Sequence, residues 1–162
     1  MVLPMKNFVI REIETGEEFE VSKLLNRVFM DFIASECSQE GISEFLRYAR
    51  ADRLNERLEE DSFILLALLQ DKTVGMIEIR EDSHISLLFV DGNYQGKGIA
   101  TRLVRAALNK CLEDDPSLKL VSVNSAPNSI KFYEKLGFVP TDSERLQNGI
   151  RFVPMELEIE TD

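Results

Sequence analysis

The sequence predicts a mixed α/β fold, in which helices flank a mostly antiparallel sheet that contains one parallel pair of strands. The spacing of apolar residues gives the element order β-α-α-β-β-β-α-β-α-β-β, with seven strands and four helices. Short turns join most consecutive strands, as antiparallel neighbours allow. One strand–helix–strand unit spans residues 84–123, and a crossover of this length makes its two strands parallel neighbours.

The first elements are a strand and two helices. Phe8–Glu14 alternates apolar and polar residues, which is typical of a strand. Apolar residues at helical spacing predict a helix over Glu17–Ile33, and a polar stretch leads to a second, amphipathic helix over about Glu44–Glu60. The many charged residues of that second helix, Arg57 among them, are expected on a solvated face.

Three strands follow in close succession. Phe63–Leu69 is continuously apolar, as a strand buried on both faces would be. A tight turn leads to a strand over Thr73–Arg80, and a second turn leads to His84–Val90. These connections predict an antiparallel meander.

The C-terminal half alternates helices and strands. An apolar stripe predicts a helix over about Gly98–Leu112, and a strand follows at Leu118–Val123. Pro127 is suited to the first turn of a further helix, and Gly137 is suited to the position just beyond its end.

The last two strands are expected to form a hairpin. Phe138–Leu146 and Ile150–Ile159 flank an Asn-Gly pair, which is the strongest short-range hairpin signal, and Pro140 and Pro154 indicate an edge strand or a bulge. Neither a linker nor a repeat interrupts the chain, so residues 1–162 are expected to form a single domain.

Composition narrows the class of function. The net charge of −10 argues against nucleic acid or an anionic membrane as the main partner. The longest apolar run, at residues 63–69, is too short to span a bilayer, and the N-terminus lacks the apolar stretch of a secretory signal, so a cytoplasmic protein is expected. Cys37, Cys111 and the single His84 are too few for a Cys/His zinc site, and no metal is expected.

The most informative segment is the glycine-rich loop after the strand at 84–90. Its glycines let the backbone approach a ligand, and the following helix N-terminus favours an anion such as a pyrophosphate, although such a loop also serves simply to start a helix. A Walker A loop would need Gly in place of Asp91 and Ser or Thr in place of Gly98. A dinucleotide fingerprint would need Gly or Ala in place of Thr101.

Two motifs in this half of the chain resemble those of the GNAT (Gcn5-related N-acetyltransferase) superfamily. Residues 95–100, QGKGIA, match its Gln/Arg-x-x-Gly-x-Gly/Ala pattern. Residues 124–138 resemble its second signature, an Asn after a strand and then a helix that ends Phe-Tyr-x-x-x-Gly-Phe. The motifs cover about residues 85–138, and the element order agrees from end to end.

The resemblance implies a fold in which two parallel strands splay apart and acetyl-CoA lies in the gap, with coenzyme A as the product. Splaying leaves strand N–H and C=O groups that must find other partners, and an extended amide-bearing arm supplies them. The implied ligands are the main chains of Leu88, Phe89 and Val90 for the pantetheine arm, the N–H groups of Gln95, Gly96, Lys97, Gly98, Ile99, Ala100 and Thr101 for the pyrophosphate, Asn124 for the pantetheine or acetyl group, and Phe132 beside the cofactor.

The resemblance also implies two catalytic residues. Tyr133 would be the general acid that protonates the departing thiolate, although it could instead only pack against the aromatic residues around it. His84 stands where histone-type members carry a glutamate base, and its imidazole is suited to accept the proton of the amine. Glu78, Glu81 or water remain alternative bases. The N–H of Leu88 or a neighbour would stabilise the oxyanion formed when the amine attacks the thioester.

The predicted function is therefore transfer of an acetyl group from acetyl-CoA to a primary amine of a small molecule or a peptide by direct attack. The acidity of the chain slightly favours a cationic acceptor. In this fold the first two helices would line the acceptor pocket, which would bring Phe29, Phe32, Glu36 and Tyr48 near it unless they serve only as helix core and surface. The alternatives are a non-catalytic acyl-CoA-binding sensor or interaction module of the same fold, and an unrelated nucleotide-binding enzyme. A homodimer is one of the open oligomeric states.

Overall fold

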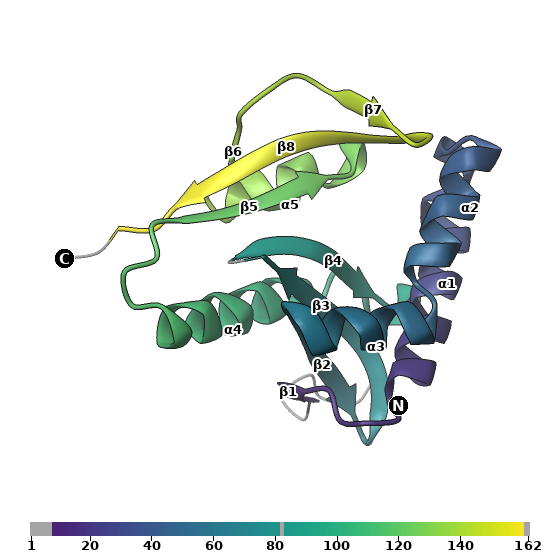
Figure 1. Cartoon of the computed structure of the whole chain (residues 1–162), viewed down its shortest axis with the longest axis horizontal. Helices are drawn as coiled ribbons and strands as arrows, with labels where there is room; N and C mark the ends of the chain where they lie inside the picture. The colour runs from purple at the N-terminus through teal and green to yellow at the C-terminus, as the bar shows by residue number, and fades with distance from the viewer. Residues whose placement is uncertain (1–7, 82, 161–162) are drawn as a thin grey trace.

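A computed structural model describes residues 8–81 and 83–160 and shows a mixed sheet between two groups of helices (Figure 1). The strands follow the order β1-β2-β3-β4-β5-β8-β6, and β7 pairs with β8 outside this path. The predicted mixed sheet with a parallel pair, β4 and β5, is confirmed. The strands are β1 (Phe8–Glu12), β2 (Ser62–Leu69), β3 (Lys72–Arg80), β4 (His84–Val90), β5 (Leu120–Ser125), β6 (Val139–Pro140), β7 (Arg145–Gln147) and β8 (Ile150–Glu158).

Helices cover both faces of the sheet and enclose two clusters of apolar side chains. Three helices contribute to one cluster and two contribute to the other. Within the described ranges, no helix has both the length and the apolar character needed to cross a membrane. The helices are α1 (Glu18–Phe32), α2 (Gln39–Tyr48) and α3 (Ala51–Glu60) on one side, and α4 (Ile99–Asp114) and α5 (Ile130–Lys135) on the other.

The prediction of one helix over Glu44–Glu60 is wrong, because the chain folds there into α2 and α3. The second element begins earlier than predicted, since the Ser38 hydroxyl accepts a hydrogen bond from the Gly41 N–H at 3.2 Å and so caps α2. The helix then breaks before Arg50, whose backbone is extended at φ −64° and ψ 145°. The two helices that result differ in direction (Figure 1).

The contact between α4 and the sheet depends on a glycine in β3. A Cβ at Gly75 would lie 3.2 Å from Leu103 Cδ1 and 3.3 Å from Ile99 Cγ2, so the missing side chain lets the helix pack closely. Both leucine and isoleucine are fully buried at this contact. The first turn of α4 is thereby held in place directly after the glycine-rich loop.

The predicted Asn-Gly hairpin is confirmed, although its first strand is shorter than expected. Asn148 and Gly149 have φ values of 52° and 80°, as a type I′ turn requires. Of the predicted strand Phe138–Leu146, only β6 and β7 form. Pro140 lies in β6, which is an edge strand of the sheet. At such an edge the missing N–H of a proline does not remove a hydrogen bond between strands.

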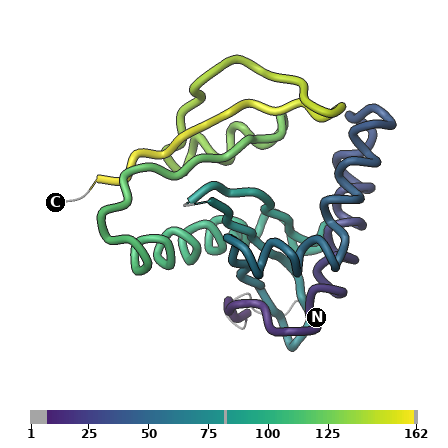
Figure 2. Tube along the Cα trace, in the orientation of Figure 1, coloured from purple at the N-terminus to yellow at the C-terminus, as the bar shows by residue number. Residues whose placement is uncertain are grey.

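The parallel pair opens along its length. β4 and β5 pair only at His84 with Ser122 and at Ile85 with Val123. Beyond these pairs the two strands diverge, and the tube in Figure 2 shows them separating toward the side of α1 and α2. β5 continues instead along β8 up to Ser125. The splay that the resemblance implied is therefore present.

Candidate active site

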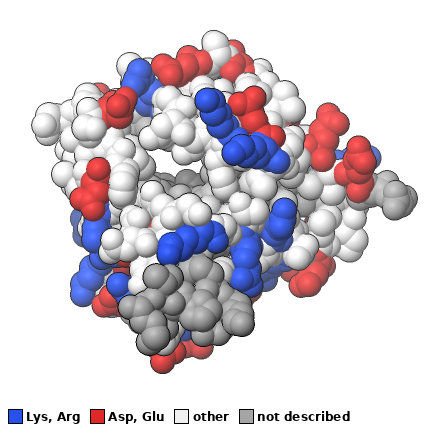
Figure 3. All heavy atoms as spheres, turned by 180° about the vertical axis from the view of Figure 1, so that it is seen from behind, with Lys and Arg blue, Asp and Glu red and all other residues white. Residues whose placement is uncertain are grey.

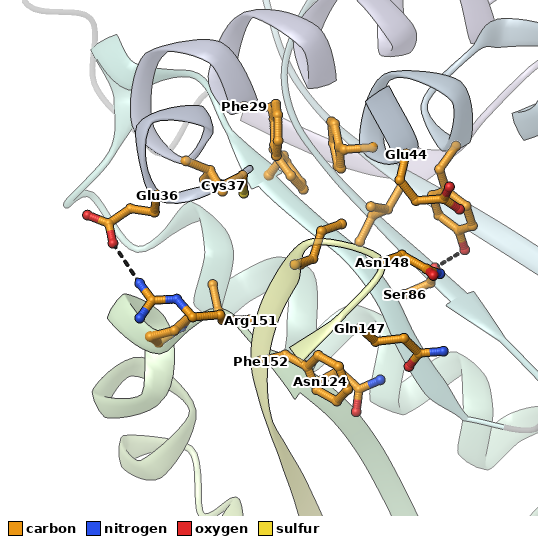
Figure 4. A pocket seen from close by; sticks show the side chains of 18 of the residues that line it. Phe29, Glu36, Cys37, Glu44, Ser86, Asn124, Gln147, Asn148, Arg151 and Phe152 are labelled. Atoms are coloured by element: carbon orange, nitrogen blue, oxygen red, sulfur yellow. Dashed lines mark hydrogen bonds and ion pairs between the residues drawn. The ribbon is translucent and has the colours of Figure 1, made fainter. Parts of the chain in front are cut away.

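A cavity of about 600 Å³ lies where β4 and β5 diverge (Figure 4). This volume falls in the range of about 300–1,000 Å³ that is usual for small-molecule sites. Four parts of the chain meet around it. Its walls include Phe29, Glu36, Phe45 and Tyr48 from the N-terminal helices and the turn between them, His84, Ser86 and Phe89 from β4, Asn124 and Asn128 from β5 and the turn after it, and Gln147, Ile150 and Arg151 from the β7–β8 hairpin.

A β-bulge in β4 sets which side chains face the cavity. Glu78 pairs with Leu87 and Ile79 with Ile85, so Ser86 has no partner in β3. Such a bulge reverses the alternation of side chains, and Ile85 and Leu88 consequently pack against the same cluster although they are three residues apart. The Ser86 hydroxyl is hydrogen-bonded to the Tyr48 hydroxyl at the cavity wall.

The glycine-rich loop offers free donors at the N-terminus of α4. Within the described chain, no backbone N–H of residues 95–101 donates to another protein group. Gly96 and Gly98 have positive φ values of 76° and 85°, and open space surrounds the position of each absent Cβ. The Gln95 side chain donates to the Val90 carbonyl at 3.0 Å and ties the loop to the end of β4. Free N–H groups before a 16-residue helix form a site suited to an anion.

A buried carboxylate fixes the start of this loop. Asp91 accepts hydrogen bonds from the Arg27 guanidinium at 2.6 Å and from the Asn93 N–H at 2.9 Å. Burial by itself would raise the pKa of the Asp91 carboxyl, but these two donors outweigh it and lower the pKa. The ion pair links α1 to the loop over 64 positions of sequence, so no local pattern could have indicated it.

Tyr133 lies in the core between the sheet and α5. Its ring packs edge-on against Phe132 and Phe138, with centroids 5.0 and 5.4 Å away, and burial raises the pKa of the phenol. The hydroxyl forms no hydrogen bond with a described residue, and only 6% of Tyr133 is exposed. Neither Tyr133 nor Phe132 belongs to the described lining of the cavity.

His84 lies at the narrow end of the cavity, where β4 still pairs with β5. It is half-buried, and its Nδ1 lies 2.7 Å from the Ser122 hydroxyl. Burial lowers the pKa of the imidazole, which favours the neutral form that can accept a proton. Of the two alternative carboxylates, Glu81 is exposed and outside the described lining. Glu78 is fully buried and likewise lies outside the described lining.

Glu78 belongs instead to a buried network that supports the cavity wall. The Arg57 Nε donates to the Glu78 carboxylate at 2.9 Å, and the Arg57 guanidinium lies 3.6 Å above the Tyr48 ring. Arg57 also donates to the Tyr48 carbonyl, and Arg80 donates to the Tyr48 hydroxyl at 3.1 Å. The expectation of a solvated Arg57 is wrong, because only 6% of the residue is exposed.

Three of the four residues expected at the acceptor end line the cavity: Phe29, Glu36 and Tyr48. Phe32 does not; it is 46% exposed, and its ring lies against Gly92 instead. The residues missed by sequence reasoning come mainly from the hairpin, where Gln147, Asn148 and Arg151 project toward the cavity (Figure 4). Their only sequence signal was the Asn-Gly turn.

Charge is evenly mixed on the surface opposite to that of Figure 1. Figure 3 shows acidic and basic side chains interspersed over this face, with a hollow bordered mainly by uncharged residues. Although the net charge is −10, acidic side chains are therefore not concentrated around this hollow.

Comparison with known proteins agrees with this arrangement. The chain is 35% identical over 83 residues to N-alpha-acetyltransferase 30 of Xenopus laevis, a match that covers 46% of this chain and 30% of that protein, so the chain corresponds to less than a third of that relative. A GCN5-related N-acetyltransferase structure from Rhodopseudomonas palustris superposes with a TM-score of 0.82 at 19% identity. The superposition covers 98% of this chain and 100% of that chain.

The PaiA N-acetyltransferase of Thermoplasma acidophilum, which was crystallised with coenzyme A, superposes with a TM-score of 0.80 at 17% identity. The superposition covers 94% of this chain and 99% of that chain. These two structures establish the fold. Residues 33–159 match the family described as the acetyltransferase (GNAT) domain. Because that match takes in most of the sequence and both signatures, the chain belongs to the GNAT acetyltransferase family.

Proposed function

We propose that this chain transfers an acetyl group from acetyl-CoA to a primary amine that enters the cavity. The observation that carries the proposal is the opening of β4 and β5 after two residue pairs, directly before a loop of free N–H groups. Unpaired strand groups need partners, and a ligand with amide groups along an extended arm would provide them.

The described residues fit such a ligand at each part of its length. The main chain of Leu88, Phe89 and Val90 borders the splay, and β3 occupies only one edge of β4 there. The N–H groups of residues 95–101 would hold the pyrophosphate, and Lys97, which is exposed, would add a positive charge. Asn124 projects into the cavity from β5 and would contact the pantetheine or acetyl end (Figure 4).

The reaction requires one proton to leave the acceptor and one to reach the departing sulfur. Acetyl-CoA would supply the carbonyl carbon, whose bond to sulfur is exchanged for a bond to the acceptor nitrogen. His84, kept neutral by its burial, would accept the proton of the amine directly or through water. Tyr133, kept protonated by its raised pKa, would donate to the thiolate, and the Leu88 N–H or a neighbour would stabilise the developing oxyanion.

A coupled assay tests the proposal. Purified protein is incubated with acetyl-CoA and a panel of primary amines, release of free thiol is followed, and thermal stability is measured with acetyl-CoA alone. We expect both stabilisation by acetyl-CoA and amine-dependent thiol release. Stabilisation without release for any amine would favour the non-catalytic acyl-CoA-binding module. Stabilisation by ATP or NAD but not by coenzyme A would contradict the proposal.

A charge reversal with a matched control makes this assay specific for the loop. Lys97→Glu places a negative charge beside the free N–H groups, and we expect it to weaken acetyl-CoA binding by roughly tenfold, the effect of about 1.4 kcal/mol. Lys119→Glu makes the same charge change at an exposed position before β5, outside the loop. Equal weakening by the two variants would contradict a pyrophosphate site at residues 95–101.

A further inference from the structure

The cavity that would receive the acceptor has an aromatic wall. The rings of Phe29 and Phe45 are stacked, with centroids 4.0 Å apart and planes 8° from parallel, and Phe89 continues the group 5.4 Å from Phe45. All three line the cavity, although each is at least 91% buried. Ile33, Leu87, Ile150 and Phe152 extend this apolar surface around the space. An acceptor therefore gains binding energy by placing an apolar group against these rings.

The carboxylates of the cavity are already paired. Two acidic residues line it, Glu36 and Glu44. Glu36 forms an ion pair with Arg151 at 3.0 Å (Figure 4), and Glu44 forms one with Arg47 at 3.1 Å. Arg80 and Arg151 add cationic groups to the same walls. Within the described lining, no carboxylate is left without a cationic partner, so a second ammonium group on the acceptor would enter an unfavourable environment.

The hairpin limits the size of the acceptor. The turn at Gly149 lies directly on the start of α2, and a Cβ at Gly149 would come within 2.9 Å of the Gly41 Cα. This contact joins the β8 side of the cavity to the helical side, and the Arg151–Glu36 ion pair connects the same two sides (Figure 4). A cavity of about 600 Å³ bridged in this way suits a whole small molecule better than a side chain that projects from a folded protein.

We infer that the acceptor of this chain is a small monoamine that carries an apolar group of about the size of a phenyl ring, and not a polycation. The inference rests on the proposed acetyl transfer and adds the chemical class of the acceptor. The amine would lie toward His84 and the splay, and the apolar group would lie against the rings of Phe29, Phe45 and Phe89.

Three primary amines of different chemical class provide the test. kcat/KM is measured by thiol release with acetyl-CoA for 2-phenylethylamine, for 1,4-diaminobutane and for a lysine peptide with a blocked N-terminus. Burial of a phenyl ring predicts a preference for 2-phenylethylamine over the diamine of roughly 10- to 100-fold. Equal or faster turnover of the diamine or of the peptide would overturn the inference while leaving acetyl transfer intact. Failure of every amine would instead refute the proposed function.

A variant of the hairpin tests the same inference from the protein side. Ile150 lines the cavity and is only partly buried, so the hairpin should tolerate its replacement. Ile150→Glu replaces an apolar side chain of the wall by a carboxylate and should reduce the preference for 2-phenylethylamine over 1,4-diaminobutane by roughly tenfold or more. Ile150→Val keeps the wall apolar and should preserve the preference. An unchanged ratio in a folded Ile150→Glu protein would contradict this placement of the acceptor.

Discussion

Breaking the ion pair between Arg57 and Glu78 should destabilise the protein strongly. Both side chains are almost completely enclosed, with exposed fractions of 8% and 0%, and they meet at 2.9 Å. Removal of one partner leaves a buried charge without compensation, which costs roughly 3–5 kcal/mol. Glu78→Leu and Arg57→Met should each lose about this much stability. For a chain of this size the loss corresponds to a fall in Tm of roughly 6–20 °C.

The double variant distinguishes a buried pair from two independent packing residues. Arg57 Nη2 is buried without a partner among the described groups, so the pair is not fully compensated even in the parent protein. Replacing both residues by apolar side chains should therefore cost less than either single change. Free energies of unfolding from urea denaturation provide the measurement. Single variants within about 1 kcal/mol of the parent, or losses that add in the double variant, would refute this reasoning.

Three further predictions concern catalysis. Tyr133→Phe should lower kcat by roughly 100-fold with nearly normal acetyl-CoA binding, as expected for loss of a general acid, and unchanged turnover would exclude that role. Burial lowers the pKa of His84 from 6.5, so kcat/KM should fall only below about pH 6.5, where the imidazole gains its proton. His84→Ala should shift or remove this acidic limb of the pH profile. An identical pH profile would exclude His84 as the base. Gly149 has a φ of 80°, and Gly149→Ala places a Cβ against Gly41, so the variant should displace the hairpin. The KM for the amine should rise at least several-fold, with acetyl-CoA binding unchanged. An unaltered KM would argue against the hairpin as a wall of the cavity.

The parts of the site that sequence could predict depend on local chemistry. Glycines at positive φ, a free helix N-terminus and an Asn-Gly turn are each determined by a few adjacent residues, and all three occur where the pattern placed them. The parallel pair followed from the length of its crossover. For this reason the loop at residues 95–101 and the strands beside it were predictable before any coordinates.

The missed features depend on contacts between distant segments. Arg57 was predicted to be solvated because its helix is rich in charged residues, and only the position of Glu78 on β3 explains its burial. The bulge at Ser86 is invisible in HISLLFV, which is compatible with an uninterrupted strand; it follows from the pairing with β3. The link between Arg27 and Asp91 has the same origin, since two elements must fold together before the ion pair exists.

Amide hydrogen exchange measured with and without coenzyme A tests the central claim most directly. In the proposed complex, the open edge of β4 and the free N–H groups of residues 95–101 receive one extended, doubly phosphorylated ligand. We expect slower exchange on addition of coenzyme A in peptides that cover residues 88–101 and 120–125, with little change in β1 or β2. Protection elsewhere in the chain, or binding that leaves the exchange of residues 88–101 unchanged, would contradict it.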